Sequence, residues 1–259
     1  MAGVASCHKV VEKMSSPERI LVALATYNEL ENLPSLLEEI WRVCPQVDVL
    51  VVDDNSPDGT GQWCEAKAAH EPRLKVTHRL GKLGIGSAHL QAMRYAIEAS
   101  YHYLITMDAD HSHRPRYLPE LLGAMQQVTD PPADVAIGSR YVKGGKIEGW
   151  PWFRRLMSRA INCYARWLLW LPVQDCSGAF RCYRVETLRK LPLEKVVSRG
   201  YSFFEEILWH LRRQGARFVE VPIVFTERAA GRSKINWREA FTAVLLILAL
   251  GLGLRPRRP

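Results

Sequence analysis

Short apolar runs alternate with amphipathic stretches along the first half of the chain. Apolar runs of strand length cover residues 19–25, 47–52 and 74–78, and a fourth leads from Tyr103 into Asp108. Between the first two runs, apolar residues recur at the spacing of one helix face, at Leu33, Leu36, Leu37, Ile40 and Trp41. Continuous apolar runs are typical of strands in mostly parallel sheets that helices cover on both faces. Three strand–helix units followed by a fourth strand therefore predict a doubly wound, mostly parallel α/β sheet with flanking helices.

The second half of the chain continues this pattern less regularly. Residues 134–137 and 218–225 are predicted strands, and Pro222 indicates an edge strand because proline cannot donate a hydrogen bond to a neighbour. An amphipathic helix is predicted over residues 150–170, where arginines are interspersed with Trp, Leu and Ile. Another helix is predicted to start at Tyr201.

Residues 241–254 are apolar throughout apart from Thr242, and a basic tail follows them. As a helix this segment would span roughly 21 Å, which is shorter than a bilayer core of about 30 Å. We therefore predict an interfacial or re-entrant membrane anchor, with a buried core helix or a dimer contact as the alternative. The resulting domain prediction is a mobile tail (1–18), one large domain (19–236), and an apolar interfacial helix with a basic tail (237–259).

Composition narrows the choice of partners. The chain has 259 residues with 47% hydrophobic content, enough for one large domain or two small ones. Its net charge of +8 favours anionic partners such as nucleotide phosphates or an acidic lipid surface. The basic residues are scattered rather than arranged in a stripe, so no nucleic-acid partner is expected. The six cysteines form no CxxC pair and no secretory signal is recognisable, so reduced thiols in a cytoplasmic protein are expected.

Two carboxylates, Asp108 and Asp110, come directly after the fourth apolar run, with the small Ala109 between them. Ligands bind just beyond the carboxyl ends of strands in doubly wound sheets. A divalent ion held by one or two carboxylates, with substrate phosphates completing its coordination, is a common Mg²⁺ arrangement. The spacing alone fits equally well a solvated strand end with two helix-capping acids.

Two further loops carry candidate chemistry. The glycine-rich loop at residues 81–87 lacks the Lys-Ser/Thr pair of a P-loop and follows the third strand rather than the first. It is therefore interpreted as close helix–strand packing beside a nucleotide site, and not as a phosphate cradle. His111 and His113 have no further ligand at zinc spacing, so surface-loop histidines are expected there. Residues 227–234 form a basic, small-residue loop of the kind that folds over phosphates.

Taken together, five motifs resemble those of family 2 glycosyltransferases of the GT-A fold, and most nearly those of dolichol-phosphate (polyprenol-phosphate) mannosyltransferases. The resemblance extends over about residues 19–237. The motifs are Thr26-Tyr27-Asn28-Glu29, Val52-Asp53-Asp54, Asp108-Ala109-Asp110, Gly138-Ser139-Arg140-Tyr141, and Arg228 with Lys234. Two positions depart from the family pattern: Ala25 stands where proline is usual, and Ser112 stands where a longer side chain sometimes supplies a metal ligand.

The resemblance implies a role for each matching residue. The substrate would be bound by Ala25 and by residues of all five motifs: Tyr27, Glu29, Val52, Asp54, Asp108, Ala109, Asp110, Arg140, Arg228 and Lys234. Asp108 and Asp110 would ligate Mg²⁺ or Mn²⁺ on the diphosphate. The acceptor phosphate would be received by Arg140, Arg154 and Ser158, which with Asp110 make up the expected catalytic set. Arg228 and Lys234 would belong to a loop that closes over the diphosphate.

The implied reaction is inverting transfer of mannose from GDP-mannose to dolichyl or another polyprenyl phosphate, at the cytoplasmic face of a membrane by a peripheral protein. A lipid phosphate is already anionic, so it needs orientation by guanidinium groups more than a general base. A small membrane subunit or a second copy is an expected partner. The nearest alternative is a polyprenol-phosphate glucosyltransferase that uses UDP-glucose.

Two other classes remain open. A nucleotidyltransferase that makes a sugar nucleotide would carry a glycine-rich basic loop after the first strand, where this chain has Thr26 to Glu29. A scaffold that binds a sugar nucleotide without catalysis would be expected to have lost Asp108, Asp110 or Arg140, and all three are present.

Overall fold

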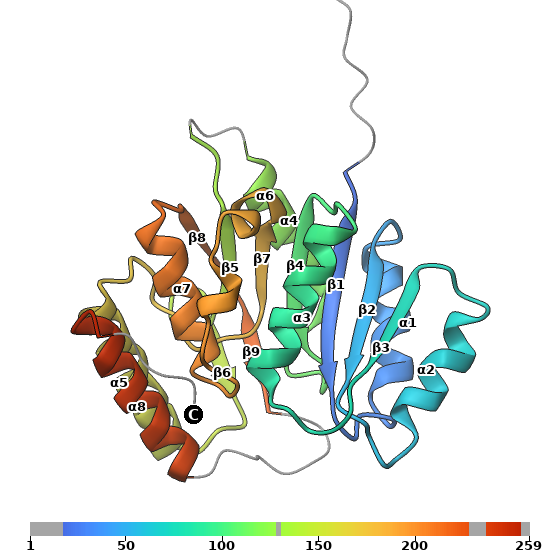
Figure 1. The fold of residues 1–259 in the computed structure, drawn as a ribbon, viewed down its shortest axis with the longest axis horizontal. Coiled ribbons are helices and arrows are strands. Elements are labelled where there is room, and N and C mark those ends of the chain that lie inside the picture. Colours follow the sequence, from blue (N-terminus) through green and yellow to red (C-terminus); the bar gives the residue numbers. More distant parts are fainter. Residues whose placement is uncertain (1–17, 128–130, 228–236, 255–259) are drawn as a thin grey trace, which may run out of the picture.

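The computed structural model describes residues 18–127, 131–227 and 237–254, and its core is a sheet between two layers of helices (Figure 1). Within these ranges the sheet has seven strands, and β7 alone among them runs antiparallel to its neighbours. In spatial order the strands are β3 (Leu74–His78), β2 (Asp48–Asp53), β1 (Ile20–Thr26), β4 (Tyr103–Asp108), β7 (Arg181–Arg184), β5 (Val135–Ser139) and β8 (Phe218–Pro222). A separate parallel pair joins β6 (Lys146–Glu148) to β9 (Val224–Thr226).

Each face of the sheet buries its own apolar cluster. One face packs against α3 (Ile85–Glu98), α6 (Val185–Arg189) and α7 (Phe203–Arg213). The opposite face packs against α1 (Leu33–Val43), the 3₁₀ turn η1 (Pro115–Tyr117) and α4 (Leu118–Gln126). Helix α2 (Thr60–Ala68) lies beside β3, and a second 3₁₀ turn, η2, covers Leu193–Lys195. Burial on both faces explains why the central strands are apolar without alternation.

Two helices lie side by side at one flank of the molecule, α5 (Trp152–Leu169) and α8 (Trp237–Gly251) (Figure 1). Ile247 and Leu250 of α8 are buried in the same apolar cluster as α3 and α7. Gly251 allows a close approach, because a Cβ there would lie 2.5 Å from Leu168 Cγ. None of the helices in the described ranges is long and apolar enough to cross a membrane.

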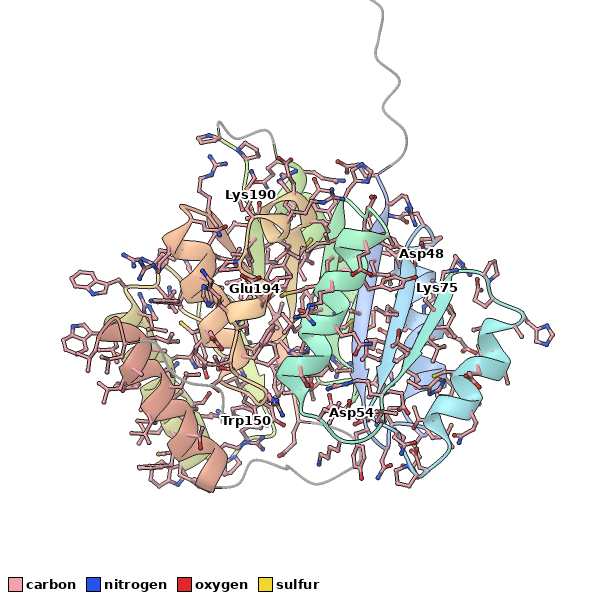
Figure 2. All side chains as sticks on the ribbon, viewed as in Figure 1. Asp48, Asp54, Lys75, Trp150, Lys190 and Glu194 are labelled. Atoms are coloured by element: carbon pink, nitrogen blue, oxygen red, sulfur yellow. The ribbon has the colours of Figure 1, made fainter. Side chains whose placement is uncertain are left out.

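The chain order reverses direction beside β1, with β2 on one side and β4 on the other. The carboxyl ends of these three strands meet, because Ala25 pairs with Asp108 and Thr26 with Asp53. Figure 2 shows Asp54 and Trp150 at this edge, and Asp48 and Lys75 at the opposite edge. Doubly wound sheets bind their ligands at such a reversal point.

Most elements lie where the sequence predicts them, with three differences. The predicted strand at 218–225 is in fact two strands, because Pro222 ends β8 at the sheet edge and β9 then joins β6. The predicted C-terminal helix begins earlier, at Trp237, and ends at Gly251. The antiparallel direction of β7 was not predicted, nor were the elements α4, α6, β6 and the two 3₁₀ turns. The predicted tail lies outside the described residues apart from Glu18.

Candidate active site

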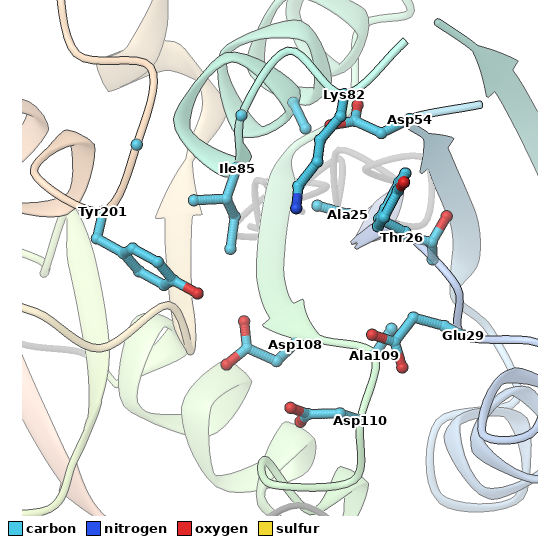
Figure 3. Close-up of a pocket in the computed structure, with 14 residues that line it drawn as sticks. Ala25, Thr26, Glu29, Asp54, Lys82, Ile85, Asp108, Ala109, Asp110 and Tyr201 are labelled. Atoms are coloured by element: carbon cyan, nitrogen blue, oxygen red, sulfur yellow. The ribbon is translucent and has the colours of Figure 1, made fainter. Parts of the chain in front are cut away.

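A pocket opens at the carboxyl edge of the sheet, beside the reversal point at β1 and β4 (Figure 3). It encloses about 920 Å³ of empty space, open mouth included. Seven residues singled out from the sequence line it together: Ala25, Tyr27, Glu29, Asp54, Asp108, Ala109 and Asp110. Residues from three separate strand ends thus line one cavity at the place where doubly wound sheets bind their ligands.

The loop after β1 is held in place by the loop after β2. Asn28 adopts a left-handed conformation, with φ of 61°, and its N–H donates to Ser56 Oγ at 3.0 Å. The N–H of Glu29 donates to Thr60 Oγ1 at 3.1 Å. These bonds fix the backbone from which Tyr27 and Glu29 project into the pocket.

Asp54 anchors a third loop while it lines the pocket. Its Oδ1 lies 2.6 Å from Arg79 Nη1, and its Oδ2 accepts from the N–H of Leu83 at 3.2 Å. Burial raises the pKa of Asp54, and the neighbouring Arg79 opposes this rise. The pair therefore ties the segment after β3 to the end of β2.

The two carboxylates of the Asp-x-Asp motif project from the end of β4 into the same pocket (Figure 3). Ser112 donates to Asp110 Oδ1 from both its N–H, at 3.1 Å, and its hydroxyl, at 2.5 Å. His113 Nδ1 accepts from the N–H of Asp108 at 3.1 Å. The turn that follows β4 therefore orients both carboxylates.

His113 is not the surface residue that the sequence analysis predicted. Its side chain is 2% exposed and stacks on Phe180, with ring centroids 5.2 Å apart. Burial lowers the pKa of His113 to about 4, although Asp110 opposes this, so the ring is neutral at pH 7. His111 is partly exposed and contacts Ser35 at 3.0 Å. The prediction was wrong for His113 because its ring packs against Phe180 and Phe225, which are distant in the sequence.

The donor atoms of Asp108 and Asp110 suit a hard divalent cation, since carboxylate oxygens are the ligands that Mg²⁺ and Mn²⁺ favour. Within the described ranges no group of three or more His, Cys, Asp or Glu side chains could hold a metal by itself. A cation at this pair would therefore need oxygens from a ligand, as the diphosphate of a nucleotide supplies.

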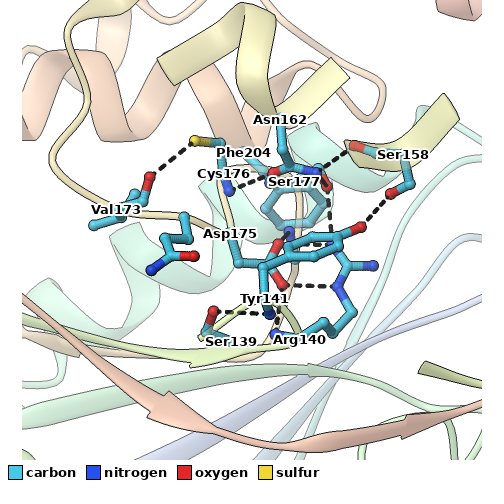
Figure 4. Close-up of polar contacts among 12 residues, drawn as sticks. Ser139, Arg140, Tyr141, Ser158, Asn162, Val173, Asp175, Cys176, Ser177 and Phe204 are labelled. Atoms are coloured by element: carbon cyan, nitrogen blue, oxygen red, sulfur yellow. Dashed lines mark hydrogen bonds and ion pairs between the residues drawn. The ribbon is translucent and has the colours of Figure 1, made fainter. Parts of the chain in front are cut away.

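Arg140 lies at the end of β5 in a buried ion pair with Asp175 (Figure 4). Its Nε and Nη2 donate to the two carboxylate oxygens, each at 2.7 Å, and its backbone N–H donates to Oδ2 at 3.0 Å. Burial by itself would lower the pKa of Arg140, but Asp175 outweighs burial and raises it, with a contribution from Asp108. The guanidinium is therefore a fixed charge whose field reaches the Asp-x-Asp motif.

Ser158 joins the same network from helix α5 (Figure 4). Its Oγ lies 2.6 Å from the hydroxyl of Tyr141, and its carbonyl accepts from Asn162 Nδ2 at 2.8 Å. Asn162 also accepts from the N–H of Cys176 at 2.7 Å. Helix α5 is thereby attached to both segments that hold Arg140.

Arg154 and Arg140 both lie near the indole ring of Trp150. The guanidinium carbon of Arg154 lies 4.0 Å from the Trp150 ring centroid, and that of Arg140 lies 5.9 Å from it. Arg154 also pairs with Glu227 at 2.9 Å. The structure thus brings Arg140, Arg154 and Ser158 into one polar region next to the pocket.

Some predicted residues lie elsewhere. The side chain of Val52 is fully buried in the core and is not among the residues that line the pocket. Arg228 and Lys234 lie outside the described residues. The sequence analysis assigned no role to Lys82 and Tyr201, which line the pocket, or to Asp175. Only the polar run around Asp175 gave any sequence signal, because a carboxylate between apolar segments needs a buried partner.

Comparison with known proteins agrees with this geometry. The model of the family "Glycosyl transferase family 2" matches residues 21–192. An undecaprenyl-phosphate mannosyltransferase of Micrococcus luteus is 43% identical over 237 residues, covering 92% of this chain and 96% of its own. A polyprenol monophosphomannose synthase of Mycolicibacterium smegmatis is 45% identical over 231 residues, covering 88% of this chain and 86% of its own.

Solved structures share the fold at low sequence identity. Glucosyl-3-phosphoglycerate synthase from Mycobacterium tuberculosis, in complex with Mn²⁺, UDP and glucosyl-3-phosphoglycerate, superposes with a TM-score of 0.65 at 20% identity. The match covers 93% of this chain and 82% of that one. A mannosyltransferase from Pyrobaculum calidifontis in complex with GDP-Man and Mn²⁺ gives 0.58 at 17% identity, covering 93% and 66%.

Proposed function

The chain belongs to glycosyl transferase family 2, and we propose that it transfers mannose from GDP-mannose to dolichyl or another polyprenyl phosphate with inversion at the sugar. The observation that carries this proposal is the pocket that unites Tyr27, Glu29, Asp54, Asp108 and Asp110 at the carboxyl edge of the sheet. The two relatives of 43% and 45% identity, whose names specify mannose and a polyprenyl lipid, support the choice of sugar and acceptor.

The donor occupies the pocket with its nucleoside toward the loops after β1 and β2. Tyr27 offers a ring face for the base, and the carboxylates of Glu29 and Asp54 accept hydrogen bonds from base or ribose. Asp108 and Asp110 would hold a divalent cation, Mg²⁺ or Mn²⁺. When bound, the cation would supply electrostatic stabilisation of the negative charge on the leaving nucleoside diphosphate.

The acceptor phosphate is oriented by the polar region around Trp150. Arg154 and Ser158 contact it, and Arg140 contributes positive charge from a guanidinium that Asp175 holds in one orientation. Because the acceptor phosphate is ionised at neutral pH, its attack on the sugar requires no general base. Positioning and charge stabilisation therefore account for the catalysis.

The flank made by α5 and α8 suits a membrane surface. Exposed apolar side chains are concentrated on these helices and at the residues that follow each of them: Trp152, Phe153, Leu156, Met157, Trp167, Trp170, Phe241, Val244, Leu245, Leu248, Leu252 and Leu254. Exposed arginines of α5, at Arg155, Arg159 and Arg166, are interspersed with them. Apolar and aromatic side chains mixed with basic ones favour the boundary of an anionic bilayer. We propose that the protein attaches peripherally through this flank, on the cytoplasmic face.

The function is tested in transfer reactions that combine each candidate donor with a polyprenyl phosphate acceptor and a divalent metal. Purified protein is mixed with liposomes that contain polyprenyl phosphate, with Mn²⁺ or Mg²⁺, and with radiolabelled GDP-mannose or UDP-glucose in separate reactions. We expect labelled lipid from GDP-mannose only, and none when EDTA replaces the metal. Labelled lipid from UDP-glucose in preference to GDP-mannose would contradict the proposed donor. Absence of lipid product from either donor would contradict the proposed function.

A further inference from the structure

Lys82 is the only cationic side chain among the described residues that line the pocket. It belongs to the loop between β3 and α3, and its side chain extends into the pocket above Asp108 (Figure 3). The ammonium nitrogen lies 4.6 Å from the centroid of the Tyr27 ring. An ammonium over an aromatic face is attracted by the ring quadrupole, typically by ~0.5–1 kcal/mol at an exposed site. Such a contact is weak enough for an entering anion to displace.

The loop that carries Lys82 is fixed on both sides of it. Before Lys82, Arg79 pairs with Asp54 at 2.6 Å and also reaches the hydroxyl of Ser87. After Lys82, the N–H of Leu83 donates to Asp54 Oδ2 at 3.2 Å. The side chains of Arg79 and Asp54 therefore hold the backbone around Lys82 at the wall of the pocket.

Glycine at position 84 completes this arrangement. Gly84 has φ of +95°, and a Cβ there would lie 2.4 Å from the carbonyl oxygen of Arg199. The next turn is also tight, since the N–H of Gly86 donates to that same carbonyl at 2.8 Å. Gly84 and Gly86 thus serve close packing, but against Arg199, Gly200 and Phe203 at the start of α7 rather than against a strand as the sequence analysis predicted. The same loop also offers the pocket a side chain.

Carboxylates outnumber cations among the described residues that line the pocket: Glu29, Asp54, Asp108 and Asp110 against Lys82. Arg79 pairs with Asp54. A divalent ion at Asp108 and Asp110 would offset those two carboxylates, and an incoming diphosphate would bring further negative charge close to Lys82. Hydrogen bonds from an ammonium to phosphate are among the strong, charge-assisted kind.

We propose that Lys82 leaves the face of Tyr27 when the nucleotide sugar enters and donates to its diphosphate, as a cationic ligand that acts beside the metal. This rests on the proposed function, because it names a further donor-binding residue of the same site. As the sugar departs, negative charge grows on the diphosphate, and an ammonium at that position stabilises it.

The test compares the affinities of the protein for nucleotides that carry two, one or no phosphates. Binding of GDP, GMP and guanosine, and of UDP, UMP and uridine, is titrated by calorimetry with Mn²⁺ and again with EDTA. The proteins are the wild type, Lys82→Gln, Lys82→Arg and the control Lys67→Gln, which removes the same charge from an exposed position on α2. We expect Lys82→Gln to lose about tenfold in diphosphate affinity, or ~1.4 kcal/mol, and little affinity for the nucleoside. We expect the diphosphate affinity of Lys82→Arg to stay within about threefold of the wild type. The control Lys67→Gln is expected to match the wild type.

Two results would overturn the proposal for Lys82. Equal losses for the nucleoside and the diphosphate would mean that Lys82 acts through the Tyr27 ring or the base. Unchanged diphosphate affinity in Lys82→Gln would mean that it does not bind the donor. If the wild type binds only the uridine series, the proposed donor is wrong, and a phosphate-dependent loss in that series still supports Lys82. If the wild type binds neither nucleotide series, both the proposed function and the proposed role of Lys82 are wrong.

Discussion

At the scale of single residues, the pairing of Arg140 with Asp175 changes what a substitution should do. Lysine keeps the charge but cannot form the two parallel bonds that the planar guanidinium makes with this carboxylate. We expect Arg140→Lys to lower kcat for lipid transfer more than tenfold, with donor Kd within about twofold of wild type. Destabilisation of roughly 1–3 kcal/mol is expected from the lost buried bonds.

Arg155→Lys serves as the control, since Arg155 lies exposed on α5. Steady-state kinetics and nucleotide titration are measured on both variants. A fall in donor affinity as large as the fall in kcat would assign Arg140 to the donor side of the site and contradict the proposed division.

Glu205 gives a prediction of pH dependence. It is buried near Arg181, and its Oε2 has no hydrogen-bond partner among the described residues. Burial raises its pKa from 4.5 to about 7. As pH rises, the unfolded chain therefore releases this proton first, and the stability associated with Glu205 is present below pH 4.5 and lost as pH rises through 7.

Glu205→Gln removes that titration. Relative to wild type, we expect the variant to gain stability between pH 5 and pH 8, by on the order of 3 kcal/mol at one pKa unit per ~1.4 kcal/mol. Urea unfolding at both pH values measures the difference, with the exposed Glu194→Gln as control. A stability difference that is the same at pH 5 and pH 8 would contradict the raised pKa.

At the scale of elements, the sequence predicts best where local pattern and tertiary environment agree. The strand Leu74–His78 and the buried face of α1 have the predicted positions, because continuous apolar runs and helical spacing are local signals. Asp108 and Asp110 were identifiable for the same reason, as a polar pair that ends an apolar strand. Burial of His113 depends on contacts with Phe180 and Phe225, which are distant in the sequence, and no local pattern reports it.

The contact of α8 with α5 gives a prediction at the same scale. At Gly251 a Cβ would lie 3.0 Å from the backbone oxygen of Leu168, as well as 2.5 Å from its Cγ. We expect Gly251→Val to push the end of α8 off α5 and to cost roughly 1–3 kcal/mol, typical of overpacking. Thermal unfolding measures this, with Gly123→Val as a variant whose new side chain meets open space. Equal melting temperatures for Gly251→Val and wild type would contradict the close contact.

At the scale of the whole molecule, the fold exposes a pocket and an apolar flank together. Trp150 lies at the carboxyl edge of the sheet (Figure 2), directly before α5, and α5 lies beside α8 (Figure 1). A lipid phosphate could then reach Arg154 and Ser158 while its chain stays in the membrane. Deleting α8 is a poor test of this idea, because Ile247 and Leu250 belong to the core.

Substitutions on the exposed face of α8 test it better. We expect Phe241→Ser with Leu245→Ser to reduce flotation with anionic liposomes severalfold, since each buried apolar side chain contributes ~1.5–3 kcal/mol at full insertion. Donor affinity should not change. Leu80→Ser, at an exposed leucine outside both helices, is the control. Unchanged flotation of the double variant, or a loss matched by Leu80→Ser, would contradict attachment through this flank.

The central claim is that the bond between the sugar and the diphosphate breaks and that the lipid phosphate takes the sugar. Phosphorus NMR of a reaction with GDP-mannose and polyprenyl phosphate tests it directly. We expect equal amounts of GDP and a mannosyl phosphodiester lipid from the wild type, and neither product from a folded Asp110→Asn variant. Formation of GMP with mannose 1-phosphate, formation of GTP when pyrophosphate is added, or near-normal turnover by Asp110→Asn would contradict this transfer reaction.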